Sequence, residues 1–127
     1  MSYTLFLDDL RDPPWWLGHE PVIARDVAEF KLAIFMYGVP SIISFDHDLG
    51  KFESGEIKPT AMVGLQWLID EHLDGRRNLN EVQQVFVHSS NPAGVLNIMG
   101  LWDSFAAHIG SNVRAVRREA PPSKGLA

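Results

Sequence analysis

Two apolar runs in this sequence end abruptly in acidic residues. The first, at residues 3–7, is followed by an acid pair, and the second, at residues 41–45, is followed by two acids that flank a histidine. The carboxylates concerned are Asp8, Asp9, Asp46 and Asp48. Carboxylates that share one crevice repel one another unless a cation compensates, and oxygen ligands without cysteine favour Mg²⁺ or Mn²⁺. A lone acid pair after a strand is usually a turn or a cap, but its repetition after a second strand favours a metal site built from these four side chains.

A third polar stretch carries groups that suit phosphate. Residues 88–91 read His-Ser-Ser-Asn and precede Pro92, and asparagine followed by proline is typical of a helix start. The free amides at a helix N-terminus favour an anion by about 0.3 to 1 kcal/mol, and hydroxyl and amide groups add hydrogen bonds to phosphate oxygens. One of Ser90 and Asn91 is expected to cap the helix whatever the function. The candidate phosphate-binding residues are Ser89, Ser90, Asn91, Asn97 and Arg11.

Histidines stand beside both groups of polar residues. His47 and His88 are the titratable side chains near this crevice whose ordinary pKa is close to neutrality, so they are the candidate acid and base. A group in that role is typically worth a factor of about 100 to 10,000 in rate. Asp46 completes the set of candidate catalytic residues. The other histidines, His19, His72 and His108, are expected to be surface or packing residues.

Three further features admit more than one interpretation. Arg11 is close enough to the acid pair either to neutralise one carboxylate or to clamp phosphate. Trp15 and Trp16 could stack on a nucleobase, or could cover an edge of the sheet where a helix is missing. Gly94 lies in the first turns of a predicted helix, where glycine costs roughly 1 kcal/mol relative to alanine, and this indicates close approach by another group.

Strand and helix patterns alternate along the chain, which is typical of a parallel α/β domain. The predicted strands lie at residues 3–7, 22–25, 41–45, 82–87 and 113–116, and the predicted helices run from Asp26 to Gly38, from Thr60 to Leu73 and from Asn91 to Ile109. The segment between the first two strands contains prolines and no helical period. We therefore expect a three-layer flavodoxin-like domain with helices on both faces, a five-stranded parallel sheet in the order 2-1-3-4-5, and no regular helix between strands 1 and 2. Ligands in such sheets bind beyond the carboxyl ends of strands 1 and 3, where the acids stand.

Composition limits the class of protein. The chain has 127 residues, of which 46% are hydrophobic and 21% charged, with no cysteine and a formal net charge of -5. These values predict one globular domain, at residues 1–119, with a flexible tail at 120–127. The lack of cysteine excludes disulfides and thiolate metal sites, and no stretch is apolar for the roughly 20 residues of a membrane span, so we expect a cytoplasmic protein. The acidic balance argues against tight, nonspecific binding to nucleic acid.

The arrangement of acids at the ends of the first and third strands and a hydroxyl at the end of the fourth resembles that of the receiver domains of response regulators. The chain resembles more closely the receiver-like branch called the cyclic-phosphate processing receiver domain. The matching segments are LDDLR at 7–11, SFDHDLG at 44–50 and HSSNPAG at 88–94, with Asn97 downstream. The resemblance implies a metal site using Asp9 and Asp46, assisted by Asp8 and Asp48, and a role in phosphate handling for His88, Ser89 and Asn91.

The chain also departs from an ordinary receiver. It has a proline–tryptophan loop in place of the first helix, two additional histidines, and arginines where a receiver ends its fifth strand with lysine. These departures favour hydrolysis or transfer of a bound phosphate over storage of an aspartyl phosphate. The leading hypothesis is a metal-dependent phosphoesterase that acts on a cyclic phosphate, either a 2',3'-cyclic RNA end or a cyclic nucleotide. The alternatives are a signalling receiver phosphorylated on Asp46 and a noncatalytic module that binds a phosphorylated ligand or a protein. The oligomeric state stays open.

Overall fold

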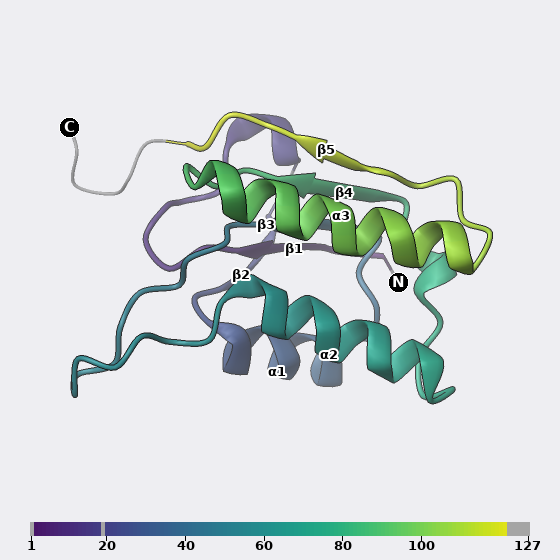
Figure 1. The fold of residues 1–127 in the computed structure, drawn as a ribbon, viewed down its shortest axis with the longest axis horizontal. Helices are drawn as coiled ribbons and strands as arrows, with labels where there is room; N and C mark the ends of the chain where they lie inside the picture. Colours follow the sequence, from purple (N-terminus) through teal and green to yellow (C-terminus); the bar gives the residue numbers. More distant parts are fainter. Residues whose placement is uncertain (1, 19, 122–127) are drawn as a thin grey trace.

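Five parallel strands form the centre of the computed structural model, which describes residues 2–18 and 20–121 (Figure 1). The strands are β1 (Thr4–Leu7), β2 (Val22–Ala24), β3 (Ile42–Phe45), β4 (Gln84–Val87) and β5 (Ala115–Arg117). Their order in the sheet is β2-β1-β3-β4-β5, as predicted. Leu7 of β1 pairs with Phe45 of β3, and Phe45 pairs with Val87 of β4. This register brings the polar residues that follow the three central strands to one edge of the sheet.

Three helices connect the strands: α1 (Val27–Tyr37), α2 (Ala61–Leu73) and α3 (Pro92–His108). The capping predictions for α1 and α3 are confirmed, since Asp26 accepts a hydrogen bond from the Glu29 amide at 2.9 Å and Asn91 accepts one from the Gly94 amide at 3.0 Å. Thr60 stands at the N-cap of α2, but its side chain makes no capping hydrogen bond. Side-chain caps therefore begin α1, which follows β2, and α3, which follows β4.

All three helices lie on one face of the sheet, so the expectation of helices on both faces is wrong in that detail. The helix α2 packs between α1 and α3, and the core joins these helices to alternate strand residues such as Leu5, Ile43 and Val85. Right-handed crossovers explain this arrangement. The connections from β2 to β3, β3 to β4 and β4 to β5 all run in one direction across the sheet, so their helices lie on the same side.

The connection from β1 to β2 runs in the opposite direction and lies over the second face of the sheet. It contains no regular helix, as predicted, but a short 3₁₀ turn, η1 (Trp15–Leu17). Trp16 packs edge-on against Phe86 with ring centroids 5.2 Å apart, and Phe6 beneath this layer is fully buried. Trp16 thus covers the sheet, whereas Trp15 is 90% exposed. The covering role is thus confirmed for Trp16 alone among the two tryptophans.

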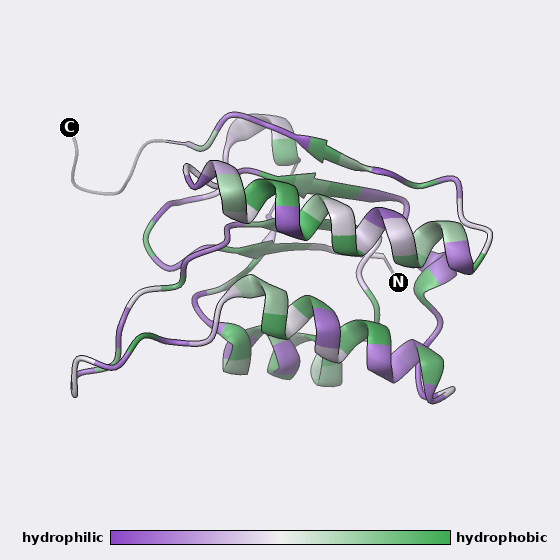
Figure 2. Cartoon of the chain, viewed as in Figure 1, coloured by the Kyte–Doolittle hydropathy of each residue, from purple (hydrophilic) through white to green (hydrophobic). Residues whose placement is uncertain are grey.

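Hydropathy follows this architecture. In Figure 2 the central strands are hydrophobic, whereas the loops beyond their carboxyl ends are largely hydrophilic. The longest of these loops joins β3 to α2 and contains an antiparallel bridge between Lys51 and Ile57. No helix among the described residues has the length and apolar character needed to cross a membrane. The predicted tail at 120–127 lies mostly outside the described residues, and so does His19.

Candidate metal and phosphate site

Three of the four predicted acidic residues form one cluster at the carboxyl ends of β1 and β3. Asp8, Asp9 and Asp46 each offer a carboxylate oxygen, and these oxygens lie within 4.8 Å of one another. Asp8 is fully buried and Asp46 is 4% exposed. The pairing of β1 with β3 holds the two segments together, because the Asp46 amide donates to the carbonyl of Leu7 at 2.8 Å.

The electrostatics of the cluster indicate a shortage of positive charge. Burial, followed by the neighbouring charge of Asp8, raises the pKa of both Asp9 and Asp46. Burial also acts to raise the pKa of Asp8, but hydrogen bonds from His88 and from the amides of Arg11 and Leu10 outweigh it, so that pKa is lowered. Three carboxylates in one buried crevice form an all-oxygen donor set, which fits a hard divalent cation.

Asp8 and Asp9 differ in how much of each carboxylate is already engaged. Oδ1 of Asp8 accepts from the amides of Leu10 and Arg11 at 2.9 and 2.8 Å, and its Oδ2 contacts His88. Asp9 instead faces the loop after β3, where Gly50 has a φ of +85° and a Cβ would lie 3.0 Å from Asp9 Oδ2. The absence of a side chain at Gly50 leaves room beside the Asp9 carboxylate. Asp9 is therefore the freest ligand of the cluster, since the oxygens of Asp46 also have partners, the His47 amide at Oδ1 and Arg11 Nη1 at Oδ2.

Arg11 spans the cluster and the phosphate side of the site. Its Nη1 lies 3.3 Å from Asp8 Oδ2 and 3.4 Å from Asp46 Oδ2, and its Nη2 lies 3.4 Å from the Ser90 hydroxyl. Its Nε is buried and lacks a hydrogen-bond partner among the described residues. Of the two predicted roles, the contacts show charge neutralisation directly.

His88 lies beneath the cluster rather than on its surface. Nε2 of His88 is 3.0 Å from Asp8 Oδ2, Nδ1 is 2.6 Å from the Ser44 hydroxyl, and all three side chains are buried. The ring stacks on Phe6 with centroids 4.7 Å apart and planes 8° apart. With both nitrogens engaged and no exposed edge, His88 orients Asp8. This placement does not favour the predicted role of His88 as acid or base toward a substrate.

The side chain of His47 lies closer to solvent and is held by Asp48 and Gly94. Its Nδ1 is 2.8 Å from Asp48 Oδ1, and Asp48 Oδ2 accepts from Asn91 Nδ2 at 3.1 Å. The His47 ring rests against Gly94, where a Cβ would come within 2.4 Å of the ring. This contact explains the glycine in α3, as the sequence predicted. Asp48 lies outside the three-carboxylate cluster, and its two oxygens are engaged by His47 and Asn91. The hydrogen bond from His47 lowers the pKa of Asp48.

The predicted phosphate-binding residues divide into those at the edge of the site and one that lies apart. Ser90 contacts Arg11, and Ser89 is 4% exposed and accepts from the Asn91 amide at 3.1 Å. Asn91 serves as both the cap of α3 and a partner of Asp48. Asn97 is exposed on α3 and makes no hydrogen bond to these residues in the described part of the chain.

Two residues of the site escaped sequence reasoning as functional groups. Ser44 is a strand residue whose hydroxyl reaches the ring of His88, and its place in the segment SFDHDLG was the available signal. Arg25 donates from Nη1 to the carbonyls of Asp8 and Arg11 at 3.2 and 2.6 Å, which fixes the loop after β1. A basic residue at the end of a short edge strand has no distinguishing pattern.

His72 lies outside the site. It packs on Phe105 and accepts a hydrogen bond from the Leu79 amide, as expected of a packing residue.

Comparison with known proteins agrees with this geometry. The profile of the family described as the cyclic-phosphate processing receiver domain matches residues 3–104. This range contains the three carboxylates, both histidines of the site and the start of α3. Searches of curated proteins and of solved structures give no match. The match covers most of the chain, which therefore belongs to the cyclic-phosphate processing receiver domain family.

Proposed function

We propose that this domain is a metal-dependent phosphoesterase that opens cyclic phosphates, with a 2',3'-cyclic RNA end or a cyclic nucleotide as substrate. The observation that carries the proposal is the cluster of Asp8, Asp9 and Asp46 beside Arg11 and the start of α3. Membership of the family supports a cyclic phosphate as the substrate class. The acidic net charge is compatible with an anionic substrate, because three of the acidic side chains lie together where a cation would bind.

Asp9 and Asp46 are the residues proposed to hold Mg²⁺ or Mn²⁺, with Asp8 fixed behind them. A divalent ion at that position supplies positive charge to a nonbridging phosphate oxygen and favours ionisation of water. Arg11 orients the phosphate through its guanidinium, and Ser89, Ser90 and the N-terminal end of α3 lie along the same edge. Developing negative charge thus meets donors that are already in place.

His47 is the proposed general acid, because its ring is partly accessible and His88 is enclosed. Its Nδ1 is engaged by Asp48, and among the described residues no hydrogen bond to its Nε2 is found. In the proposed reaction the oxygen of water bonds to phosphorus and the bond to one bridging oxygen breaks. His47 gives its Nε2 proton to the departing alkoxide, the attacking water releases one proton to solvent, and His47 takes up a proton from solvent afterwards. The net reaction adds one water, and the product is a phosphate monoester.

The test is a turnover assay with 2',3'-cyclic and 3',5'-cyclic nucleotides, in Mn²⁺, in Mg²⁺ and in EDTA. The expected result is metal-dependent opening by the wild type and loss of that activity in Asp9→Asn, with activity retained in Asp70→Asn on the exposed side of α2. Equal inactivity of the wild type and Asp9→Asn on every substrate would overturn the proposal. Acid-labile phosphate on the protein after treatment with acetyl phosphate and Mg²⁺, lost in Asp46→Asn, would instead support a signalling receiver.

A further inference from the structure

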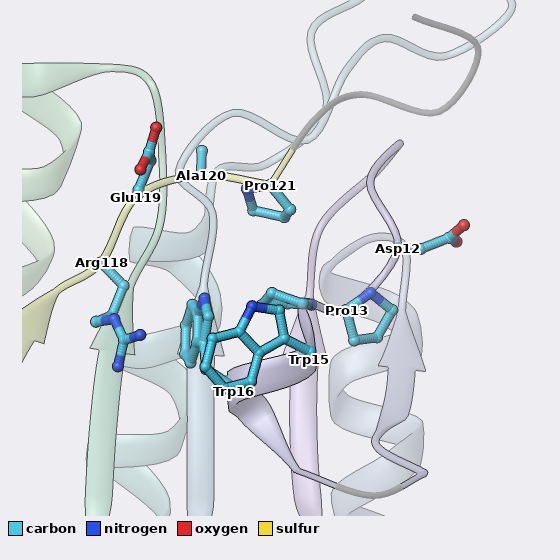
Figure 3. Close-up of a pocket in the computed structure, with 9 residues that line it drawn as sticks. Asp12, Pro13, Trp15, Trp16, Arg118, Glu119, Ala120 and Pro121 are labelled. Atoms are coloured by element: carbon cyan, nitrogen blue, oxygen red, sulfur yellow. The ribbon is translucent and has the colours of Figure 1, made fainter. Parts of the chain in front are cut away.

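One cleft of the structure plays no part in the proposed chemistry. It has a volume of about 790 Å³, and its walls are the loop that carries Trp15 and Trp16 and the segment after β5 that carries Arg118 and Pro121 (Figure 3). Binding pockets for small molecules typically enclose about 300 to 1,000 Å³. The cleft is therefore large enough for a nucleobase and its sugar.

The cleft adjoins the candidate metal and phosphate site. The Arg118 amide donates to the carbonyl of Val87 at 2.9 Å, and Val87 is the residue directly before His88. On the other wall, Asp12 lines the cleft and follows Arg11, whose guanidinium contacts the acidic cluster and Ser90. Both walls of the cleft thus continue into chain segments that form the phosphate edge.

The aromatic residues of the cleft have different surroundings. The guanidinium of Arg118 lies over Trp16, 4.0 Å from the ring centroid, and Trp16 also packs on Phe86 (Figure 3). Trp15 is 90% exposed, the largest exposed fraction among the large hydrophobic residues of the described chain. Trp15 and Arg118 line the same cleft, and an indole that is left in water there offers a π surface for a planar ligand.

We propose that this cleft binds the nucleobase of the phosphate substrate, stacked on Trp15 beside the Arg118 guanidinium. The inference rests on the proposed function in one respect, which is that the base and the phosphate belong to the same ligand. A nucleobase fits better than an apolar group because its planar face stacks on indole and its carbonyl oxygens can accept hydrogen bonds from guanidinium. Trp16 serves as the support that positions Arg118.

Equilibrium binding in EDTA separates this inference from turnover. The ligands are nucleoside 5'-monophosphates and, as the matched probe without a base, ribose 5-phosphate, measured by calorimetry and by quenching of tryptophan fluorescence. In the wild type the base is expected to strengthen binding roughly tenfold or more, the range typical of stacking on an aromatic side chain. The variant Trp15→Ala should lose that advantage and bind both ligands alike, whereas Trp15→Phe should retain most of it.

The control is Phe35→Ala, which removes an exposed aromatic side chain on α1 outside this cleft and should leave nucleotide binding unchanged. Nucleotide affinity that is the same in Trp15→Ala and the wild type would overturn the inference, even if Asp9-dependent turnover is found. Base-dependent binding that requires Trp15, without turnover of any cyclic phosphate, would sustain the inference and defeat the proposed function. Calorimetric binding of N-acetyltryptophanamide with no binding of nucleotides would overturn it in favour of a protein ligand.

Discussion

His88 and Asp8 form a fully buried pair, with Nε2 of the histidine 3.0 Å from Oδ2 of the aspartate. The histidine is anchored on its other side by Ser44. The histidine fixes the orientation of the carboxylate, in the way that outer-shell partners orient the ligands of metal sites. This relationship supports the proposal that His88 positions the cluster and that His47 is the general acid.

Replacement of His88 tests the positioning role. In His88→Phe the ring can still stack on Phe6, but the Ser44 hydroxyl loses its partner and Asp8 Oδ2 keeps only its contact with Arg11. Each buried polar group left unsatisfied costs about 1–3 kcal/mol, so we expect a lower free energy of unfolding in urea denaturation. Loss of an outer-shell partner should weaken Mn²⁺ binding by about 10- to 100-fold in calorimetry. Ser44→Ala should have a smaller effect on both. Unchanged Mn²⁺ affinity in His88→Phe would contradict the role.

Neutralisation of Asp46 should stabilise the metal-free protein. Burial and the charge of Asp8 raise the Asp46 pKa, so at neutral pH the ionised carboxylate destabilises the folded state relative to the unfolded chain. In the wild type the His47 amide donates to Asp46 Oδ1. Asp46→Asn removes the charge, and the oxygen of the asparagine side chain can still accept that hydrogen bond. We expect the melting temperature in EDTA to rise by a few degrees while Mn²⁺ no longer stabilises the variant. Asp70→Asn should change neither property, and a lower melting temperature in Asp46→Asn would refute the argument.

Metal binding should weaken with acid at a pH above the ordinary aspartate pKa of about 3.9. The pKa values of Asp9 and Asp46 are raised, so these ligands take up protons earlier as pH falls and compete with the cation, whereas Asp8 has a lowered pKa and stays ionised. Calorimetry of Mn²⁺ binding in buffers of different ionisation enthalpy should show proton release on the acid side. The variant Asp9→Asn should release fewer protons when it binds Mn²⁺. Affinity that stays constant through mildly acidic pH would exclude these carboxylates as ligands.

The contact between Gly94 and His47 predicts opposite effects for two glycines of α3. In Gly94→Ala the new Cβ would come within 2.4 Å of the His47 ring, so the ring must move, and we expect loss of turnover with the helix content retained. Gly100→Ala on the same helix meets no heavy atom within 4 Å and should stabilise the protein by about 1 kcal/mol, with unchanged turnover. Circular dichroism and the cyclic nucleotide assay measure the two effects. Full activity in Gly94→Ala would show that the position of the His47 ring is unimportant.

Much of the fold was predictable from local patterns. Apolar runs and caps such as Asp26 and Asn91 are short-range signals, and they located all five strands and all three helices. The placement of every helix on one face follows from the strand order and from the right-handedness of each crossover connection. The general α/β pattern that predicted two helical layers does not contain this information. Strand ends differ by one or two residues, since β4 begins at Gln84 and β5 at Ala115.

The sequence by itself determined which residue types gather at the site. Acids that end β1 and β3 must meet, because the strands are neighbours and parallel, and the cluster of Asp8, Asp9 and Asp46 confirms that expectation. Only the tertiary structure decided the division of labour between the histidines. His88 is enclosed by Phe6 and Ser44, which come from other strands, whereas His47 lies on Gly94 beside Asp48. Burial and hydrogen-bond partners arise from contacts between segments far apart in the chain, so no local pattern could tell the two rings apart.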